Sequence, residues 1–380
     1  MSLPQPKGKQ IEVLDLKPKG HNVILGTAGS GKTTLAIYRS IYLAKMESEE
    51  RVLLVTFNTT LVKYLDAIVG NDIPQNIDVH NYHKFARGYL ESRGKMPKCK
   101  GIVSGMEDGD NRKLCFVRKA LANVIETIGL NSTLKRDETV FLEEINWIEK
   151  MGISSLDEYE KVERIGRMDT RIKRDNRKYF FKVYQEYIVV RKEAGYLYDW
   201  EDLAQTVYAE MMKDDRQRMY KHIVVDEGQD LSPMMIKSLV KAVPEDGTFT
   251  FFGDVAQQIY GSRLSWREAG LNIKKNQIWY FDRNYRNSKE IAEFALSLSD
   301  SEYFSDRQDL VHPILPSASS PLPAVLQFDN DRKELKWMVD TAIKQSGNQS
   351  IAILLRNRAL VNKVEKELKD KGIKPQVLKN

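Results

Sequence analysis

The sequence predicts an α/β fold in which a parallel β-sheet carries helices on both faces. Short apolar runs of β type recur along the chain, each followed by a turn or polar segment and then a helical pattern. A Gly-rich loop separates the first run from its helix. The stretch from roughly 105 to 215 differs, because it shows long amphipathic helical patterns and few strand signals. It therefore predicts an all-helical insertion between strands of the sheet.

The composition is that of a globular protein, and no membrane span is visible. Of 380 residues, 42% are hydrophobic and 29% are charged, enough for two or three packed domains. No apolar run reaches about eighteen residues, and the N-terminus lacks the apolar core of a secretory signal. Cys99 and Cys115 are too few for a four-thiolate zinc site and fit a reducing cytoplasm, where we expect the protein. The net charge of +6 permits a polyanionic partner.

The apolar runs and helical patterns define the expected domains. A first α/β domain is predicted at 1–104 and 216–286, and the helical insertion occupies 105–215 between its two parts. Phe116–Ile128 and Lys178–Ala194 are the clearest helical patterns of the insertion. The runs expected to form strands of the first domain are Val23–Leu25, Val52–Phe57, Ile223–Val225, Phe249–Phe252 and Ile278–Phe281.

After the first domain, the chain predicts the beginning of a second α/β domain at 287–380. Asn287 is expected to cap a helix, with Glu290 as its reciprocal partner. The Ser- and Pro-rich segment Ser317–Pro323 predicts a loop. Beyond it we expect two strands and a helix, at Ala324–Phe328, Ile351–Leu355 and Ala359–Lys371.

The Gly-rich segment Gly26–Thr34 matches the pattern G-x-x-x-x-G-K-[ST]. An apolar strand pattern precedes it and a helical pattern follows, a context that disfavours an ordinary Gly-rich turn. Backbone N–H groups at such a helix start bind phosphate. Lys32 would reach the β- and γ-phosphates of ATP, and the Thr33 hydroxyl would hold Mg²⁺. The residues of the predicted ATP site are Gly26, Thr27, Ala28, Gly29, Ser30, Gly31, Lys32, Thr33 and Thr34.

Two adjacent carboxylates end the apolar run Ile223–Val225. In an ATPase with such a loop, a neighbouring strand presents an Asp to Mg²⁺, which assigns Asp226 to the metal. Glu227 could then take a proton from the attacking water. A solvated strand end is the alternative, and the upstream loop favours the catalytic interpretation. Ser232 and Pro233 predict only the cap and first turn of the next helix.

Several further segments, in a fixed order, resemble those of the UvrD/Rep-type helicases of superfamily 1. The sequence VDEGQD is similar to their VDExQD signature, GDVAQQIY to their GDxxQxIY segment, and NYRNS to their NYRxS segment. A glutamine upstream of the loop, two early DNA-contact segments and a DFxDL-like element also resemble the family. The positions concerned are Gln10, Thr56–Asn58, Tyr82–Ala86, Asp199–Leu203, Val225–Asp230, Gly253–Tyr260 and Asn284–Ser288.

This resemblance implies a RecA-like P-loop domain followed by the beginning of a second one, with ATP and Mg²⁺ as cofactors. By resemblance, Gln10 reads adenine and Tyr285 stacks on it. Gln257 senses the γ-phosphate, and Arg286 is an arginine finger. Catalysis would therefore rest on Lys32, Glu227, Gln257 and Arg286.

The resemblance also implies contacts with single-stranded DNA and duplex junctions. The implied DNA-binding residues are Phe57, Asn58, His83, Tyr260 and Trp266. Core packing is the alternative for the aromatic ones, above all for Trp266, whose spacing from Tyr260 is longer than the family pattern. The basic stretch Lys161–Lys192 could add a DNA contact, whereas its aromatics recur at helical spacing and predict a buried stripe.

Two functions remain open at this point. The resemblance implies an ATP-dependent DNA helicase, moving 3′ to 5′ on single-stranded DNA. Nothing after Lys371 resembles two later motor segments of the family, so the chain is expected to be an N-terminal portion. Such a portion should bind ATP and DNA but unwind poorly alone. The alternative is a regulatory module that binds ATP and DNA without unwinding.

Overall fold

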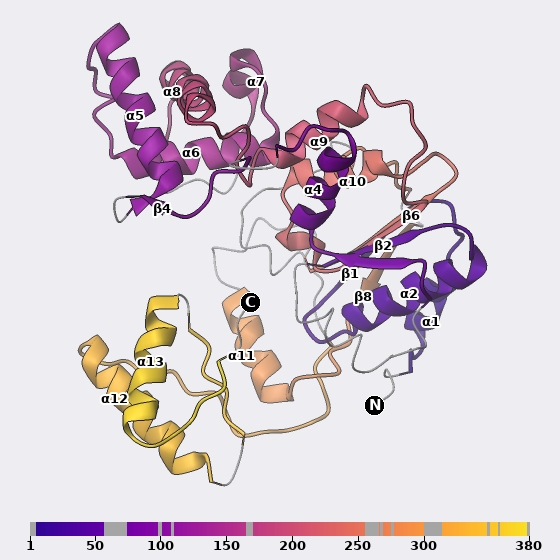
Figure 1. Cartoon of the computed structure of the whole chain (residues 1–380). Coiled ribbons are helices and arrows are strands. Elements are labelled where there is room, and N and C mark those ends of the chain that lie inside the picture. Colours follow the sequence, from indigo (N-terminus) through magenta and orange to yellow (C-terminus); the bar gives the residue numbers. More distant parts are fainter. Residues whose placement is uncertain are drawn as a thin grey trace. The chain divides into compact units, whose positions relative to one another are not determined.

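The computed structural model of the chain forms two compact units, Met1–Ala318 and Ser319–Asn380 (Figure 1). The first unit contains a β-sheet and a group of helices inserted between its strands. The second contains two helices and the segments that connect them. The structure describes residues 5–56, 74–97, 101–107, 110–164, 170–254, 266, 269–274, 277–299, 314–347, 350–355 and 358–377.

The main sheet of the first unit is parallel throughout, which confirms the predicted α/β class. Its strand order is β3-β2-β6-β7-β1-β8. The sequence did not predict β3, because all of its residues are only half-buried and polar side chains interrupt it. The strands are β1 (Gly20–Gly26), β2 (Val52–Val55), β3 (Ile77–His80), β6 (His222–Val225), β7 (Thr248–Gly253) and β8 (Ile278–Phe281).

Helices cover both faces of this sheet. Successive side chains of a strand point to opposite faces, so apolar side chains on both faces are buried against helices. Ile24 of β1 packs in one core cluster with α1 and α2, whereas Val23 and Leu25 pack in another with α4, α9 and α10. Ser232 caps α10 by accepting a hydrogen bond from the Met235 N–H, as predicted. The helices are α1 (Lys9–Leu14), α2 (Lys32–Met46), α4 (Tyr82–Ser92), α9 (Leu203–Met211) and α10 (Pro233–Ala242).

The inserted helices, drawn at the upper left of Figure 1, have a hydrophobic core of their own. Phe180, Tyr184 and Tyr187 are buried in it, so the aromatic stripe of the basic stretch is core packing, as predicted. The helices are α5 (Arg112–Ile128), α6 (Glu138–Met151), α7 (Leu156–Lys161) and α8 (Arg174–Glu193). None of the described helices has both the length and the apolar character that crossing a membrane requires.

The insertion differs from the prediction in two respects. A small hairpin, β4 (Met106–Glu107) with β5 (Asp110–Asn111), precedes α5, so the stretch from 105 is not wholly helical. Toward its end, α9 packs in the core cluster of the sheet and not with the inserted helices, because its apolar side chains face α4 and α10.

The two ends of the insertion meet. Ile102 and Tyr198 form an isolated parallel bridge. The Val103 N–H donates to the Tyr198 carbonyl at 2.8 Å, and the Tyr198 N–H donates to the Gly101 carbonyl at 2.9 Å. The chain therefore leaves the sheet domain and returns to it at one place.

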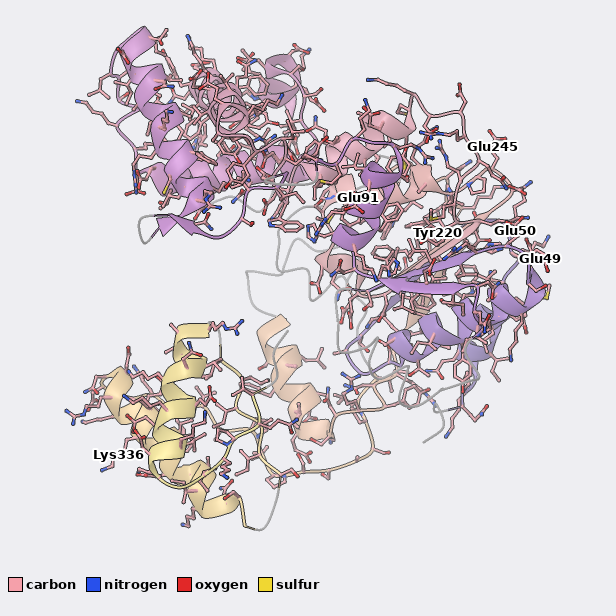
Figure 2. All side chains as sticks on the ribbon, in the orientation of Figure 1. Glu49, Glu50, Glu91, Tyr220, Glu245 and Lys336 are labelled. Carbon is pink, nitrogen blue, oxygen red and sulfur yellow. The ribbon has the colours of Figure 1, made fainter. Side chains whose placement is uncertain are left out.

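At the end of the sheet where the strands begin, Lys221 forms ion pairs with three acidic side chains. Its ammonium lies 2.8 Å from the Glu47 carboxylate, 3.6 Å from that of Glu50 and 3.3 Å from that of Asp246. Figure 2 shows Glu50 and Glu245 on the same side of the unit. The phosphate loop follows β1 at the opposite end of the sheet, where the strands end.

After β8, the chain turns into α11 (Lys289–Ser299). The cap of this helix is Ser288, whose Oγ accepts a hydrogen bond from the Ile291 N–H at 3.3 Å. The predicted cap was Asn287, which is wrong by one residue. The Asn287 N–H instead donates to the Asn284 side chain at 3.0 Å, so this residue belongs to the preceding turn.

In the second unit, α12 (Asp331–Gln345) packs against α13 (Arg358–Asp370) through Val339, Ala342 and Val364. The helix expected at 359–371 corresponds to α13. The strands expected at 324–328 and 351–355 are not formed, although both segments are described. A strand needs a hydrogen-bonded neighbour, and apolar side chains of these segments such as Leu354 remain exposed.

Candidate ATP and nucleic-acid site

The loop between β1 and α2 surrounds the side chain of Lys32. The Lys32 ammonium donates hydrogen bonds to the carbonyl oxygens of Gly26 and Thr27, both at 2.9 Å. It lies 3.9 Å from the Asp254 carboxylate. Burial lowers the pKa of Lys32, against the neighbouring carboxylates of Asp254 and Glu227. The positive charge thus lies inside the loop, at the N-terminus of α2 where a phosphate would be bound.

Gly29 of the loop allows a later segment of the chain to approach closely. Gly29 has a φ of 77°, and a Cβ there would lie 2.5 Å from Oδ1 of Asn284. Its carbonyl oxygen accepts a hydrogen bond from the Tyr285 N–H at 2.9 Å, so the NYRNS segment contacts the loop directly. Tyr285 and Arg286 are exposed beside it, which suits contact with a bound nucleotide.

Gln10 approaches the loop from the other direction. Its side-chain nitrogen donates a 2.9 Å hydrogen bond to the Ser30 carbonyl, and its oxygen accepts one from the Lys7 N–H. The approach depends on Gly31, where a Cβ would lie 2.9 Å from the Gln10 nitrogen. The structure therefore brings Gln10, the loop and the 285–286 pair together.

Asp226 and Thr33 form the part of the site that fits Mg²⁺. Their side chains are hydrogen-bonded, and Asp226 is 2% exposed. Burial and the adjacent Glu227 raise the pKa of Asp226 to about 7, despite that hydrogen bond. Its Oδ1 atom is buried without a hydrogen-bond partner among the described residues. A buried carboxylate oxygen of this kind beside a hydroxyl is a suitable pair of ligands for Mg²⁺.

Glu227 follows Asp226 in an unusual backbone conformation. Its φ is 53°, the only positive value at a described residue other than glycine. Its Oε2 atom accepts a 2.6 Å hydrogen bond from the Gln229 side chain, whose oxygen accepts a 3.0 Å bond from the Asp254 N–H. Such conformations concentrate at functional sites, where the surrounding structure holds them.

A hollow of about 580 Å³ runs along α4 in the same unit. His83 lies in its wall, where its ring packs edge-on against the Trp200 ring, 5.0 Å away. His83 Nε2 lies 3.3 Å from the Trp200 carbonyl oxygen, and burial lowers the pKa of the imidazole. Basic and aromatic side chains share the lining, among them Lys84, Arg87, Tyr89, Arg93 and Tyr220.

Comparisons with known proteins identify the family of this arrangement. Residues 7–277 match the UvrD/REP helicase N-terminal domain, and residues 279–380 match the UvrD-like helicase C-terminal domain. The chain belongs to the UvrD/REP helicase family. The second match begins within β8, a strand of the sheet of the first unit, and therefore before the expected boundary at 287.

Relatives with assigned names support the same family. The chain is 24% identical to the ATP-dependent DNA helicase srs2 of Schizosaccharomyces pombe, over 94% of this chain and 42% of that protein. It is 22% identical to the ATP-dependent DNA helicase Rep of Buchnera aphidicola, over 95% of this chain and 53% of that protein. The chain thus spans about half the length of the curated relatives it matches.

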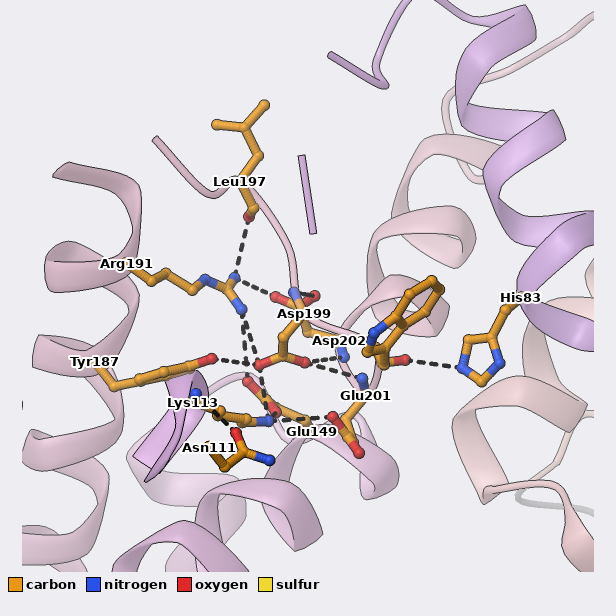
Figure 3. Close-up of polar contacts among 11 residues, drawn as sticks. His83, Asn111, Lys113, Glu149, Tyr187, Arg191, Leu197, Asp199, Glu201 and Asp202 are labelled. Atoms are coloured by element: carbon orange, nitrogen blue, oxygen red, sulfur yellow. Dashed lines mark hydrogen bonds and ion pairs between the residues drawn. The ribbon is translucent and has the colours of Figure 1, made fainter. Parts of the chain in front are cut away.

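Within this member of the UvrD/REP family, the DFxDL-like element joins the inserted helices to α4 (Figure 3). The Asp199 carboxylate accepts hydrogen bonds from Tyr187 at 2.7 Å and Arg191 at 3.1 Å, and forms an ion pair with Lys113 at 2.8 Å. The next residue, Trp200, contacts His83. Asp199 and Trp200 therefore connect the inserted helices to His83, a predicted DNA-contact residue.

This cluster contains three carboxylates, of Glu149, Asp199 and Glu201, close enough to hold a metal ion. The Lys113 ammonium lies within 3.3 Å of each, so a side chain already supplies the positive charge. Burial opposes the charge on Lys113, but these carboxylates outweigh it and hold its pKa well above the ordinary value. The cluster is an internal ion network.

The remaining predicted DNA contacts have mixed outcomes. Phe57, Asn58 and Tyr260 lie outside the described residues, as does Gln257, the predicted γ-phosphate sensor. The Trp266 ring packs edge-on against Phe251, 5.0 Å away, beside the core of the sheet. This position favours core packing, the alternative that the sequence left open for Trp266.

Sequence reasoning gave no role to two residues of the site, Gln229 and Asp254. Both lie within the family segments VDEGQD and GDVAQQIY, so their positions were recognised but their contacts were not. Their contacts depend on the turn that follows β6 and on the pairing of β6 with β7, which the motifs alone do not specify. Both are buried, and together they connect Glu227 to Lys32.

Proposed function

We propose that this chain binds Mg-ATP at the loop between β1 and α2 and hydrolyses it as part of a DNA helicase motor. The observation that carries the proposal is the pairing of Thr33 with Asp226, whose buried Oδ1 has no described partner. Asp226 directly follows β6, beside the loop that surrounds Lys32. These are the groups that ATP phosphates and Mg²⁺ require.

Each residue then has a distinct role. Lys32 and the backbone of the loop bind the phosphates, and Thr33 and Asp226 hold Mg²⁺, which neutralises phosphate charge when bound. Glu227 accepts a proton from the attacking water. Arg286, exposed next to Gly29, stabilises charge that develops on the transferred phosphoryl group. Gln10 and Tyr285 hold the adenine.

Single-stranded DNA is the proposed polymer partner. The hollow along α4 combines cations with aromatic rings, the pattern that binds phosphates and stacks bases without reading sequence. His83 and Lys84 lie at the start of this helix. Movement 3′ to 5′ and action at duplex junctions follow from the family and are proposed here for this chain.

The test compares ATP hydrolysis by the wild type and by Glu227→Gln, each with and without single-stranded DNA. We expect DNA to raise the wild-type rate, and the variant to bind ATP but turn over about 100-fold more slowly, because the amide cannot accept the proton. ATP binding without hydrolysis in the presence of DNA would contradict the enzyme proposal.

Strand separation of a partial duplex at saturating Mg-ATP then distinguishes a helicase from a binding module. The sequence led to the expectation of slow hydrolysis and poor unwinding, because two motor segments of the family were not found. Unwinding by this chain would contradict that expectation, whereas DNA-stimulated hydrolysis without unwinding would support the narrower activity.

A further inference from the structure

The side chain of Gln229 links the ends of two neighbouring strands. Its nitrogen donates a 2.6 Å hydrogen bond to Oε2 of Glu227, just after β6. Its oxygen accepts a 3.0 Å hydrogen bond from the Asp254 N–H, just after β7. Gln229 is buried, so bulk water competes little with either bond. One amide therefore satisfies groups from two separate segments of the ATP site.

The turn after β6 explains how this side chain reaches back to Glu227. The left-handed conformation of Glu227 is followed by the short helix η2 (Gly228–Asp230), in which the Asp230 N–H donates to the Glu227 carbonyl at 3.0 Å. Gly228 allows the turn to lie against β7, because a Cβ there would be 2.1 Å from the Phe251 ring. The packing of the turn thus holds a conformation that costs energy for a residue with a Cβ.

We propose that Gln229 is a positioning residue for ATP hydrolysis, which holds the Glu227 carboxylate in the orientation that activates water. The inference rests on the proposed function, in which Glu227 is the base. An unrestrained glutamate side chain samples several rotamers, whereas a base must lie within hydrogen-bond reach of the proton that it accepts. The amide binds Oε2, which leaves Oε1 as the oxygen that takes the proton.

The same amide fixes the backbone at Asp254, whose carboxylate lies 3.9 Å from the Lys32 ammonium. The base and the strand end that faces the phosphate-binding lysine are therefore held as one unit. The hydrogen bonds of Lys32 to the loop do not involve Gln229. Losing the amide should consequently reduce turnover far more than nucleotide affinity.

The first test replaces Gln229 with Met, which has a similar length but can make neither bond. Gln229→Met should lower kcat about 10-fold and change the affinity for ATP less than about 2-fold. Gln229→Glu keeps the shape but repels Glu227, so it should not restore kcat. Gln205→Met on α9 is the matched control and should leave kcat unchanged. Equal kcat in Gln229→Met and the wild type would overturn the proposal.

A second measurement needs no turnover. Hydrogen exchange at the Asp254 amide should be about 10-fold faster in Gln229→Met than in the wild type, because the amide loses its acceptor. Exchange at Phe249 and Phe251 within β7 should stay unchanged, which controls for unfolding. Equal exchange at Asp254 would show that the link is not made and would overturn the proposal. A wild type without ATPase activity would instead refute the proposed function. Hydrogen exchange at Asp254 would still test the hydrogen bond to the Gln229 side chain.

Discussion

The Lys113 ammonium lies 2.8 Å from the Asp199 carboxylate, and this contact joins the helical insertion to the chain that returns to the sheet. Both side chains are buried, and the charges of Glu149, Glu201 and Arg191 complete the network around them. Trp200 follows Asp199 directly and contacts His83 on α4. The ion pair therefore supports the position of the proposed DNA-binding surface as well as the fold.

Replacing Lys113 with Met should destabilise the protein by about 3–5 kcal/mol, because three carboxylates would lose their shared cation. Denaturant unfolding followed by circular dichroism measures this free energy. Lys119→Met, at an exposed position of the same helix, is the control and should change it by less than about 0.5 kcal/mol. Similar effects of the two variants would show that the cluster adds little stability.

Replacing Gly228 with Ala should destabilise the protein by about 1–3 kcal/mol, because the new methyl group would overlap the Phe251 ring. Turnover should fall as well, since Glu227 lies in the same turn. Gly88→Ala on α4 is the control, because nothing lies within 4 Å of its Cβ position. That variant should be neutral or slightly more stable. Thermal unfolding of both variants checks the prediction, and an unaffected Gly228→Ala would contradict the packing described.

Lys32→Ala should remove most ATP binding, measured by calorimetry with Mg-ATP. The change removes the charge that lies within the loop and leaves the backbone of the loop to bind the phosphates alone. Lys45→Ala, in the last turn of the same helix, is the matched control and should bind ATP normally. Unchanged affinity in Lys32→Ala would count against the assignment of the site.

Binding to single-stranded DNA should fall steeply with salt and depend little on sequence, because phosphate contacts release counterions. Lys84→Ala should reduce the slope of log affinity against log salt by about 0.7, the contribution of one phosphate contact in single strands. Lys45→Ala should leave that slope unchanged. Fluorescence anisotropy at several salt concentrations checks this. A flat salt response of the wild type would contradict the DNA proposal.

The sequence predicted the parts of the fold whose physical signal is local. Buried parallel strands are continuous apolar runs, which located β1, β6 and β7. It missed β3, whose polar residues share the sheet with better buried neighbours. It also expected strands at 324–328 and 351–355, because apolar runs do not show whether a hydrogen-bonded neighbour is present.

The sequence predicted site residues where a motif fixes both residue type and spacing. The structure brings Thr33 to Asp226 and Gln10 to the loop, and their roles in binding Mg²⁺ and adenine stay predictions. The link made by Gln229 depends on the left-handed backbone of Glu227 and on contact between two strands. Neither the backbone conformation of Glu227 nor the contact between the two strands can be predicted from the sequence alone.

The bridge between Ile102 and Tyr198 has a consequence for the order of folding. Val55 of β2 pairs with Val225 of β6 across the whole insertion, and closing so long a flexible loop is entropically costly. The inserted helices contact residues nearer in sequence and form their own core, so they can form early. Once the bridge joins their ends, the effective separation between β2 and β6 shortens. We therefore expect the formed insertion to speed the long-range pairing of β2 with β6.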